Sequence, residues 1–357
     1  MSDPVYDEAN LHQEKQADYR VLNIRGEHHT IGQYLGQHTP LRTLPRRSPK
    51  APDLDYAWAC LRAVSRFHAG IEAEYRGFAE TKGLPLSDLL PHISLNVTNG
   101  QVGQCSTFGY RGKAGQIVIG RNYDFRYRQQ LRYLIHTAPP GYAALVGTNS
   151  GLIGGRYDGV NEHGLFVSLH TVMADRPEIV GPGVPFHLVV RIALETCRTA
   201  REAMDAIRLM PHVHSFNYFM ADQHEMYVVE AHPEQVQVMG GRADILAATN
   251  HYEHPALQRL HGRRSLVHSR ARLAYLSHPP QGWADDTYRT AQRLLSDHSV
   301  PVCGHQDGAA TLWSAVCDPA ERRVAYALGA PCRNPYQDMS WPGGNWAFRT
   351  IEIQRET

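Results

Sequence analysis

The sequence has no apolar run that approaches the length needed to span a bilayer. Its opening, MSDPVYDEANLHQEKQADYR, is polar and acidic and lacks an apolar signal core, so we expect a cytoplasmic protein. A net charge of +1 over 357 residues argues against nucleic acid or a membrane surface as a partner. Internal repeats and low-complexity segments are also absent from the sequence.

Cysteine is sparse, and its spacing excludes the common metal and redox motifs. The six cysteines form no Cys-x-x-Cys pair and no close framework, so free thiols are expected. The 21 histidines include no His-Glu-x-x-His motif, and the close pairs His28–His29 and His212-x-His214 have no evident third ligand. We therefore predict a protein that uses neither a metal nor an organic cofactor.

Residues 99–125, NGQVGQCSTFGYRGKAGQIVIGRNYDF, combine the pattern of a β-hairpin with a reactive cysteine. A turn centred near Lys113 places Cys105 opposite Arg121, with Asp124 just past the end of the strand. The Arg121 guanidinium would favour the thiolate, which is the nucleophilic form of cysteine. Asp124 would hold and orient an amine beside it.

The hairpin offers no histidine as a general base. An α-amino group has a pKa near 8 and suits proton transfer, so the base can be the amine of Cys105 itself. This hypothesis requires cleavage between Gln104 and Cys105 in a loop-like stretch. The alternatives are a buried, inert Cys105, or a nucleophilic Ser106 or Thr107, although these two are better explained as strand residues.

Cys-Ser-Thr-Phe followed by Gly-Arg-Asn-Tyr-Asp-Phe resembles the N-terminal-nucleophile (Ntn) amide hydrolases with a cysteine nucleophile. These include penicillin V acylase, choloylglycine hydrolase and the isopenicillin N (acyl-CoA:6-aminopenicillanic acid) acyltransferases. The long stretch before Cys105 is similar to the acyltransferase branch, whose precursors cut themselves. The resemblance extends from about residue 22 to about residue 332, and it implies catalytic roles for Cys105, Arg121 and Asp124.

Two later motifs extend this resemblance. The motif Asn-Glu-His-Gly-Leu at 161–165 precedes a strand. In the resembled family, a residue just after this strand donates its backbone N–H to the oxyanion. That position falls on His170 or Thr171 here. The Thr-Asn pair ending at Asn250 matches the family's oxyanion asparagine. Arg270 is the best candidate for a second active-site cation. Gly304 departs from the pattern, because the family often has an arginine there.

Strands in hairpins and helices in pairs predict an α+β protein of layered sheets. The resemblance sharpens this expectation to a four-layer αββα sandwich with a helical N-terminal segment. Residues 1–104 are then a cleaved but associated pro-segment, and residues 105–357 form one catalytic chain. The helices are expected over 54–82, 186–209, 265–276 and 286–297, with Thr199 as a cap. Hairpins are expected at 216–231, 236–249 and 311–329.

The implied function is hydrolysis of a linear amide in a small N-acyl compound through a thioester. Acyl transfer from acyl-CoA or an acyl amide to an amine is the alternative. A conventional thiol enzyme or metalloenzyme and an unprocessed, inactive binding module also stay open. The expected partners are the substrate and, for the two cleaved chains, each other. The aromatic tail, with Trp341, Trp346 and Phe348, either packs back on the body or contacts a partner subunit, which leaves a homo-oligomer open.

Overall fold

The computed structural model describes residues 18–39, 51–93, 104–126, 131–149, 151–175, 180–262, 265–304 and 309–344. Two sheets form its centre, an 8-stranded sheet and a 6-stranded sheet. The larger sheet contains, in spatial order, β1 (Asp18–Arg25), β4 (Leu131–Ala138), β5 (Leu145–Asn149), β6 (Asp158–Asn161), β7 (Phe166–Thr171), β8 (Phe216–Ala221), β9 (Met226–His232) and β10 (Gln235–Gly241). The smaller sheet contains β11 (Ile245–Ala248), β2 (Ser106–Arg111), β3 (Ile117–Arg126), β12 (Ala309–Asp318), β13 (Arg323–Ala327) and β14 (Gln337–Met339).

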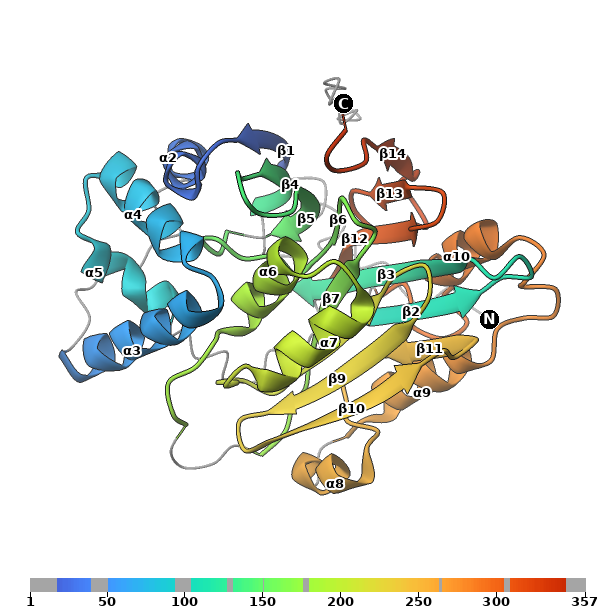
Figure 1. The fold of residues 1–357 in the computed structure, drawn as a ribbon. Helices are drawn as coiled ribbons and strands as arrows, with labels where there is room; N and C mark the ends of the chain where they lie inside the picture. The colour runs from blue at the N-terminus through green and yellow to red at the C-terminus, as the bar shows by residue number, and fades with distance from the viewer. Residues whose placement is uncertain are drawn as a thin grey trace.

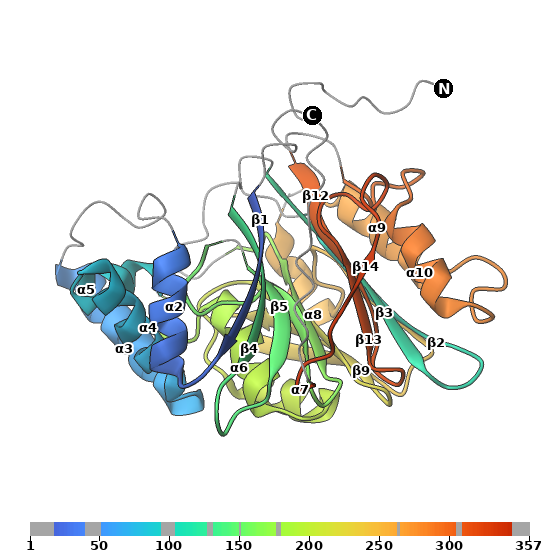
Figure 2. The same ribbon diagram turned by 90° about the horizontal axis from the view of Figure 1, so that it is seen from above.

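Helices cover the outer face of each sheet, as Figures 1 and 2 show. Helices α6 (Phe186–Thr196) and α7 (Ala200–Leu209) pack on the larger sheet. Helices α9 (Val267–Ser277) and α10 (Thr287–Leu295) pack on the smaller one. A short helix, α8 (Pro255–Gln258), and a 3₁₀ turn, η3 (Arg259–His261), precede α9. The predicted α+β, four-layer αββα sandwich is therefore confirmed.

Polar contacts join the inner faces of the two sheets. The hydroxyl of Thr107 on β2 lies 2.9 Å from the hydroxyl of Ser168 on β7. Trp313 on β12 donates its indole N–H to Asp158 on β6 over 2.8 Å. Buried polar groups keep their hydrogen bonds in this interior, so the sheets pack in a defined relative position.

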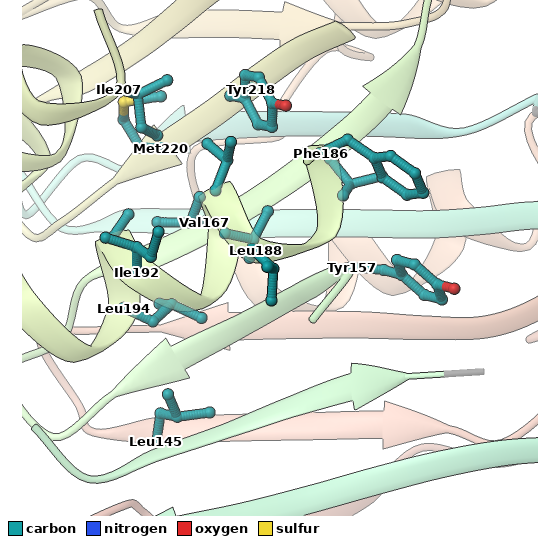
Figure 3. Close-up of a cluster of buried hydrophobic side chains, with 14 of the residues drawn as sticks. Leu145, Tyr157, Val167, Phe186, Leu188, Ile192, Leu194, Ile207, Tyr218 and Met220 are labelled. Atoms are coloured by element: carbon teal, nitrogen blue, oxygen red, sulfur yellow. The ribbon is translucent and has the colours of Figure 1, made fainter. Parts of the chain in front are cut away.

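The larger sheet buries its outer face under α6 and α7. Figure 3 shows Leu188, Ile192 and Leu194 of α6 beside Val167 of β7 and Met220 of β8. Both faces of the sheet are covered, so β7, β8 and β9 are buried almost throughout instead of alternating between buried and exposed residues.

The N-terminal segment adds a strand and several helices to this body. Its strand β1 pairs in parallel with β4 at the edge of the larger sheet. Its helices are α2 (His28–His38), α3 (Ala51–Phe67), α4 (Gly70–Lys82) and α5 (Leu86–Leu89), followed by the 3₁₀ turn η2 (Leu90–His92).

Helices α2 and α4 approach each other closely at two glycines. A Cβ atom at Gly32 would lie 1.9 Å from the carbonyl oxygen of Glu74, and one at Gly77 would lie 2.0 Å from that of His29. Only glycine permits this approach of the two backbones. The contact explains why α4 contains glycine despite its cost to the helix.

A buried ionic network connects the N-terminal helices to α6. The Oε2 atom of Glu195 lies 3.0 Å from His28 Nε2 and 2.7 Å from His68 Nε2. Arg191 contacts Glu195 Oε1 at 2.6 Å and Glu74 Oε2 at 3.1 Å. Burial alone would raise the pKa of Glu195, but Arg191 and the two histidines hold it well below its usual value. The network therefore joins residues on both sides of Cys105 in the sequence.

One predicted hairpin is wrong. Residues 236–249 were expected to pair with themselves, but β10 pairs with β9 in the larger sheet and β11 pairs with β2 in the smaller sheet. The chain leaves β10 through Gly240 (φ 111°) and Gly241 (φ 124°), a conformation that favours glycine. Two adjacent glycines indicate a turn in the sequence, and they do not reveal that the chain changes sheets.

Other predicted elements are confirmed. The helical region 54–82 is broken at His68, between α3 and α4. The hydroxyl of Thr199 caps α7 by accepting the Glu202 backbone N–H over 3.2 Å.

Trp341 packs back on the body and donates its indole N–H to the Glu162 carbonyl. Trp346 and Phe348 lie outside the described residues. No helix in the described ranges is both long and apolar enough to cross a membrane.

Candidate active site

Cys105 immediately precedes β2, at the open end of the β2–β3 hairpin. The predicted register is wrong by one residue on each strand: Arg121 lies opposite Thr107, not opposite Cys105. The turn runs from Gly112 to Gln116, with Gly115 at φ 86°, so its centre lies one residue beyond Lys113. Because side chains alternate along a strand, the pairing with Thr107 keeps Arg121 on the same face as Cys105.

The Cys105 thiol is buried, with only 2% of the residue exposed, and it donates to the carbonyl oxygen of Asp124 over 3.8 Å. The backbone N–H of Gln104 donates to the same oxygen over 3.3 Å. No histidine in the described part of the chain hydrogen-bonds to this thiol. Burial raises the pKa of Cys105 above its ordinary value, although Arg121 and Arg272 act to lower it. Arg121 thus acts in the expected direction by favouring the thiolate, but the effect of burial is larger.

Arg121 is fully buried and held by three acceptors. Its Nη2 donates to the Leu169 carbonyl at 2.7 Å, its Nε lies 3.5 Å from Asp158 Oδ2, and its Nη1 lies 3.4 Å from the Thr107 hydroxyl. The guanidinium also lies 5.5 Å from the centre of the Tyr123 ring. Asp158 balances much of its charge, which leaves Arg121 a fixed cation between the two sheets.

Asp124 was expected just past the end of the strand, but it lies within β3, opposite Thr311 of β12, and is fully buried. A Cβ atom at position 304 would lie 2.7 Å from Asp124 Oδ2. Gly304 therefore leaves room for the carboxylate, which gives a structural reason for the glycine that replaces the arginine of the resembled pattern. The charge of Asp124 acts to raise the pKa of the Cys105 thiol.

His170 and Thr171 have different surroundings. The ring of His170 is fully buried between the sheets, with Nδ1 3.2 Å from the Asn217 carbonyl oxygen and Nε2 2.8 Å from the Thr107 hydroxyl. Burial, aided by the charge of Arg121, lowers the pKa of His170 well below its ordinary value, so the ring is neutral. Thr171 is half-buried, and its carbonyl accepts the Asn250 Nδ2–H over 2.9 Å.

Asn250 is held in one orientation by three contacts. Its backbone N–H donates to the Ser269 hydroxyl, its Nδ2 donates to Thr171, and its Oδ1 accepts from Arg272 Nη2 over 3.0 Å. Since Arg272 can only donate, Oδ1 must face it, and the amide nitrogen is directed to the other side. One Nδ2–H is used by Thr171, and the amide retains a second donor.

Arg270 was expected to be the second cation of the site, but it is exposed. Arg272, with 1% of the residue exposed, lies there instead. Its Nη1 donates to the carbonyls of Gln104 and Cys105 and to the Ser106 hydroxyl, the last two over 2.6 and 2.8 Å. The inward face of α9 is Ser269, Arg272 and Leu276, at helical spacing, but the exposed Val267 on the same helix means that the sequence pattern does not identify this face.

Two groups of side chains in the described residues could hold a metal ion. One is His28, His68 and Glu195 in the buried network, and the other is His298, Cys303 and Cys332. In each group the potential ligand atoms lie within 4.8 Å of one another. Neither group contains Cys105, whose charged neighbours are Arg121, Asp124 and Arg272. Sequence spacing did not reveal these groups, because each includes at least one residue that is distant in the sequence from the others.

The family model described as acyl-coenzyme A:6-aminopenicillanic acid acyl-transferase matches residues 110–333. The match begins after Cys105 and includes Arg121, Asp124, Asn250 and Arg272. No curated protein matches the sequence.

Several solved structures resemble the chain. Penicillin V acylase from Agrobacterium tumefaciens is 16% identical, with a TM-score of 0.44, over 66% of this chain and 86% of that one. An N-acylethanolamine-hydrolyzing acid amidase ortholog from Caenorhabditis elegans is 18% identical, with a TM-score of 0.44, over 60% and 93%. A mutant of conjugated bile acid hydrolase from Clostridium perfringens is 13% identical, with a TM-score of 0.39, over 66% and 92%.

Proposed function

The chain belongs to the acyl-coenzyme A:6-aminopenicillanic acid acyl-transferase family, and from this premise we propose that it is a self-processing cysteine Ntn hydrolase. It cleaves the chain before Cys105 and then hydrolyses a linear amide bond of a small N-acyl compound. The observation that carries the proposal is the position of Arg272, which donates to the carbonyls on both sides of the Gln104–Cys105 bond and to Asn250. One cation thus contacts the proposed cleavage site and the proposed oxyanion donor.

In the processing step, the Cys105 sulfur adds to the carbonyl carbon of Gln104. Negative charge develops on the Gln104 oxygen, where the guanidinium of Arg272 already donates. The peptide C–N bond breaks, its nitrogen takes a proton, and Gln104 is left as a thioester on the sulfur. This bond breakage frees the α-amine of Cys105, and water then hydrolyses the thioester, which releases the carboxyl group of Gln104 and frees the thiol.

In turnover, the freed α-amine takes the proton of the Cys105 thiol as the sulfur attacks the substrate carbonyl. Asp124 orients the resulting ammonium group, and Arg121 stabilises the thiolate. The second Nδ2–H of Asn250 and a backbone N–H near Thr171 bind the oxyanion. The leaving amine takes the proton back, and water hydrolyses the thioester. His170 serves as a positioning residue in this scheme, because Thr107 and Asn217 occupy both ring nitrogens.

Acyl transfer is the second candidate, and the family match favours it as the alternative. Both reactions share the thioester and differ only in whether water or an amine attacks it. Hydrolysis is the default, because acyl transfer also needs a pocket that retains an amine and limits water.

The test incubates processed protein with a panel of N-acyl amino acids, with and without an added amine or acyl-CoA. Products are followed by mass spectrometry. Release of free acid from an amide supports hydrolysis. Efficient use of an acyl thioester with an amine acceptor, together with negligible amide hydrolysis, would favour the acyltransferase. An intact chain that turns over none of these compounds would support a binding module instead.

The intact mass and the N-terminal residue of each fragment test the processing step separately. Fragments of 104 and 253 residues are expected from cleavage before Cys105. We propose that they stay associated, because β1 pairs with β4 and the Glu195 network joins α2 and the α3–α4 junction to α6.

A further inference from the structure

We propose that His298, Cys303 and Cys332 form a Zn²⁺ site beside the candidate active site. This proposal is independent of the proposed amidase function, because it rests on a separate group of side chains. The three potential ligand atoms lie within 4.8 Å of one another. His298 follows α10, Cys303 lies in the loop before β12, and Cys332 lies in the turn after β13. A shared ion would therefore join the α10–β12 connection, which holds both His298 and Cys303, to the turn after β13.

The spacing is close to what a tetrahedral zinc site needs. Zn–S bonds of about 2.3 Å and Zn–N bonds of about 2.0 Å place the ligand atoms of such a site roughly 3.5–3.8 Å apart. Ligand atoms already within 4.8 Å need to move by about an ångström at most. Three protein ligands leave the fourth position for a water molecule, as in other Cys₂His zinc sites.

The three side chains differ in burial, and Cys303 is the most deeply buried of them. Cys303 is almost completely buried, Cys332 is half-buried, and the Nε2 atom of His298 is buried although the chain around it reaches the surface. The neighbouring Cys332 thiol, burial and the charge of Asp124 together raise the pKa of Cys303. A cation between the sulfurs would reverse this effect, because a coordinating thiol is deprotonated.

The donor chemistry selects the metal. Two sulfurs and one imidazole nitrogen form a soft-to-borderline set that suits Zn²⁺ and its spectroscopic substitute Co²⁺ more than Mg²⁺ or Ca²⁺. The other candidate group is less suitable. Its only anionic ligand, Glu195, already contacts Arg191 at 2.6 Å, so a divalent cation would be added next to a guanidinium.

The site would stabilise the loop that shapes the Asp124 pocket. Cys303 is directly followed by Gly304, whose Cα lies against the Asp124 carboxylate. The Gly304 N–H donates to the Thr311 hydroxyl, and the Thr311 N–H donates back to the Gly304 carbonyl. The Thr311 hydroxyl also lies 4.0 Å from Cys303 Sγ, so a metal bound through Cys303 would fix the residue next to these hydrogen bonds.

The experiment measures metal in the purified full-length protein after removal of any affinity tag. We expect close to one zinc per chain by elemental analysis, and less than a tenth of that in Cys303→Ala/Cys332→Ala. The control Cys60→Ala/Cys197→Ala removes two other buried thiols and should retain the zinc. Cys105→Ala should also retain it, which separates this site from the proposed nucleophile and from any failure of self-cleavage.

Co²⁺ absorption tests the proposed coordination in the wild-type protein, without any variant. Metal-free protein titrated with Co²⁺ should develop thiolate-to-cobalt charge-transfer absorption and the intense visible bands of tetrahedral coordination, saturating at one equivalent. If the double variant does not fold, the single variants Cys332→Ala, at a half-buried position, and His298→Ala take its place. Absence of zinc uptake, equal uptake by the Cys303/Cys332 variant, or a Cys303–Cys332 disulfide in the isolated protein would each overturn the proposal.

Discussion

Arg272 donates a hydrogen bond to the carbonyl oxygen of Gln104, the residue that precedes the proposed nucleophile. This contact reaches from α9 to the residue two positions before β2, and it joins residues that are 168 positions apart in the sequence. It places a buried cation on the carbonyl that must become an oxyanion during self-cleavage. The first prediction tests this relationship.

Arg272→Ala should slow the appearance of the two fragments by about 10²–10³-fold, the usual cost of removing one oxyanion donor. Arg272→Lys should cleave faster than Arg272→Ala but slower than the wild type, because a point charge does not reproduce the several directed donors of a guanidinium. Gel electrophoresis after a synchronised start of synthesis gives the rate. Arg270→Ala is the matched control on the same helix. If Arg272→Ala is cleaved as fast as Arg270→Ala, Arg272 has no role in the cleavage step.

Cys105→Ala should remain one chain, because the sulfur that attacks the Gln104 carbonyl is missing. Edman sequencing of the larger wild-type fragment should begin Cys-Ser-Thr-Phe. Ser106→Ala and Thr107→Ala serve as controls for the two rival nucleophiles, and both should still be cut before Cys105. If Cys105→Ala is cut at that bond, cleavage is not autocatalytic.

Asp124→Asn should lower turnover by at least about a hundredfold while the melting temperature stays comparable, as expected for a group that orients a general base. The amide is nearly isosteric, so it fits beside Gly304 without the charge. Asp338→Asn, which removes an exposed ion pair with Arg323, should leave turnover unchanged. Turnover is measured on fully processed protein, so that a defect in cleavage is not mistaken for one in catalysis. Near-normal activity in Asp124→Asn would remove this residue from the mechanism.

Stability should fall as the pH drops from about 6.5 to about 4. Burial lowers the pKa of His136, His212 and His251 to about 4, so each is neutral in the folded protein and takes a proton more readily when unfolded. When folding lowers the pKa of a group, the resulting stabilisation is fully present at pH values above the pKa of the unfolded state. It is lost as the pH falls through the pKa of the folded state. For His212, a pKa of about 4 against the ordinary 6.5 corresponds to roughly 3 kcal/mol.

Urea unfolding of the single-chain Cys105→Ala protein between pH 8 and pH 4 measures this loss. In His212→Gln the amide can still donate to the Ile207 carbonyl, and the dependence on pH should be weaker. The exposed His278→Gln should keep the wild-type dependence. A His212→Gln curve parallel to that of the wild type would show that His212 does not titrate on unfolding.

Glu195→Ala should destabilise the single-chain Cys105→Ala protein by about 3–5 kcal/mol, because it leaves the buried Arg191 and two histidines without their shared carboxylate. Glu225→Ala is the control, since it removes an ion pair with the exposed Arg201 and should cost less than about 1 kcal/mol. Equal losses of unfolding free energy in the two variants would show that the Glu195 network adds little to stability.

Local patterns in the sequence predicted most of the elements and part of the candidate site. Turn residues, helical periodicity and the Thr199 cap are local, so the β2–β3 hairpin and the α6–α7 pair follow from neighbouring residues. The choice of sheet is not local: β10 and β11 differ in their partners because tertiary packing separates them. The choice between Arg270 and Arg272 depended on which face of α9 is buried. The turn centre lies one residue beyond Lys113, in a turn where Gly115 takes a positive φ.

The parallel pairing of β1 with β4 has a consequence for how the mature protein would be made. The uncut chain folds as one polypeptide, and its edge strand reaches β4 by an intramolecular search. After cleavage before Cys105, the same strand belongs to a different molecule, so refolding from denaturant becomes second order in protein. Recovery of the processed form should therefore fall on dilution, whereas the Cys105→Ala chain should recover equally at all concentrations. Cleavage would thus turn the folding of one chain into the assembly of a heterodimer. The chain would therefore have to fold before it is cut.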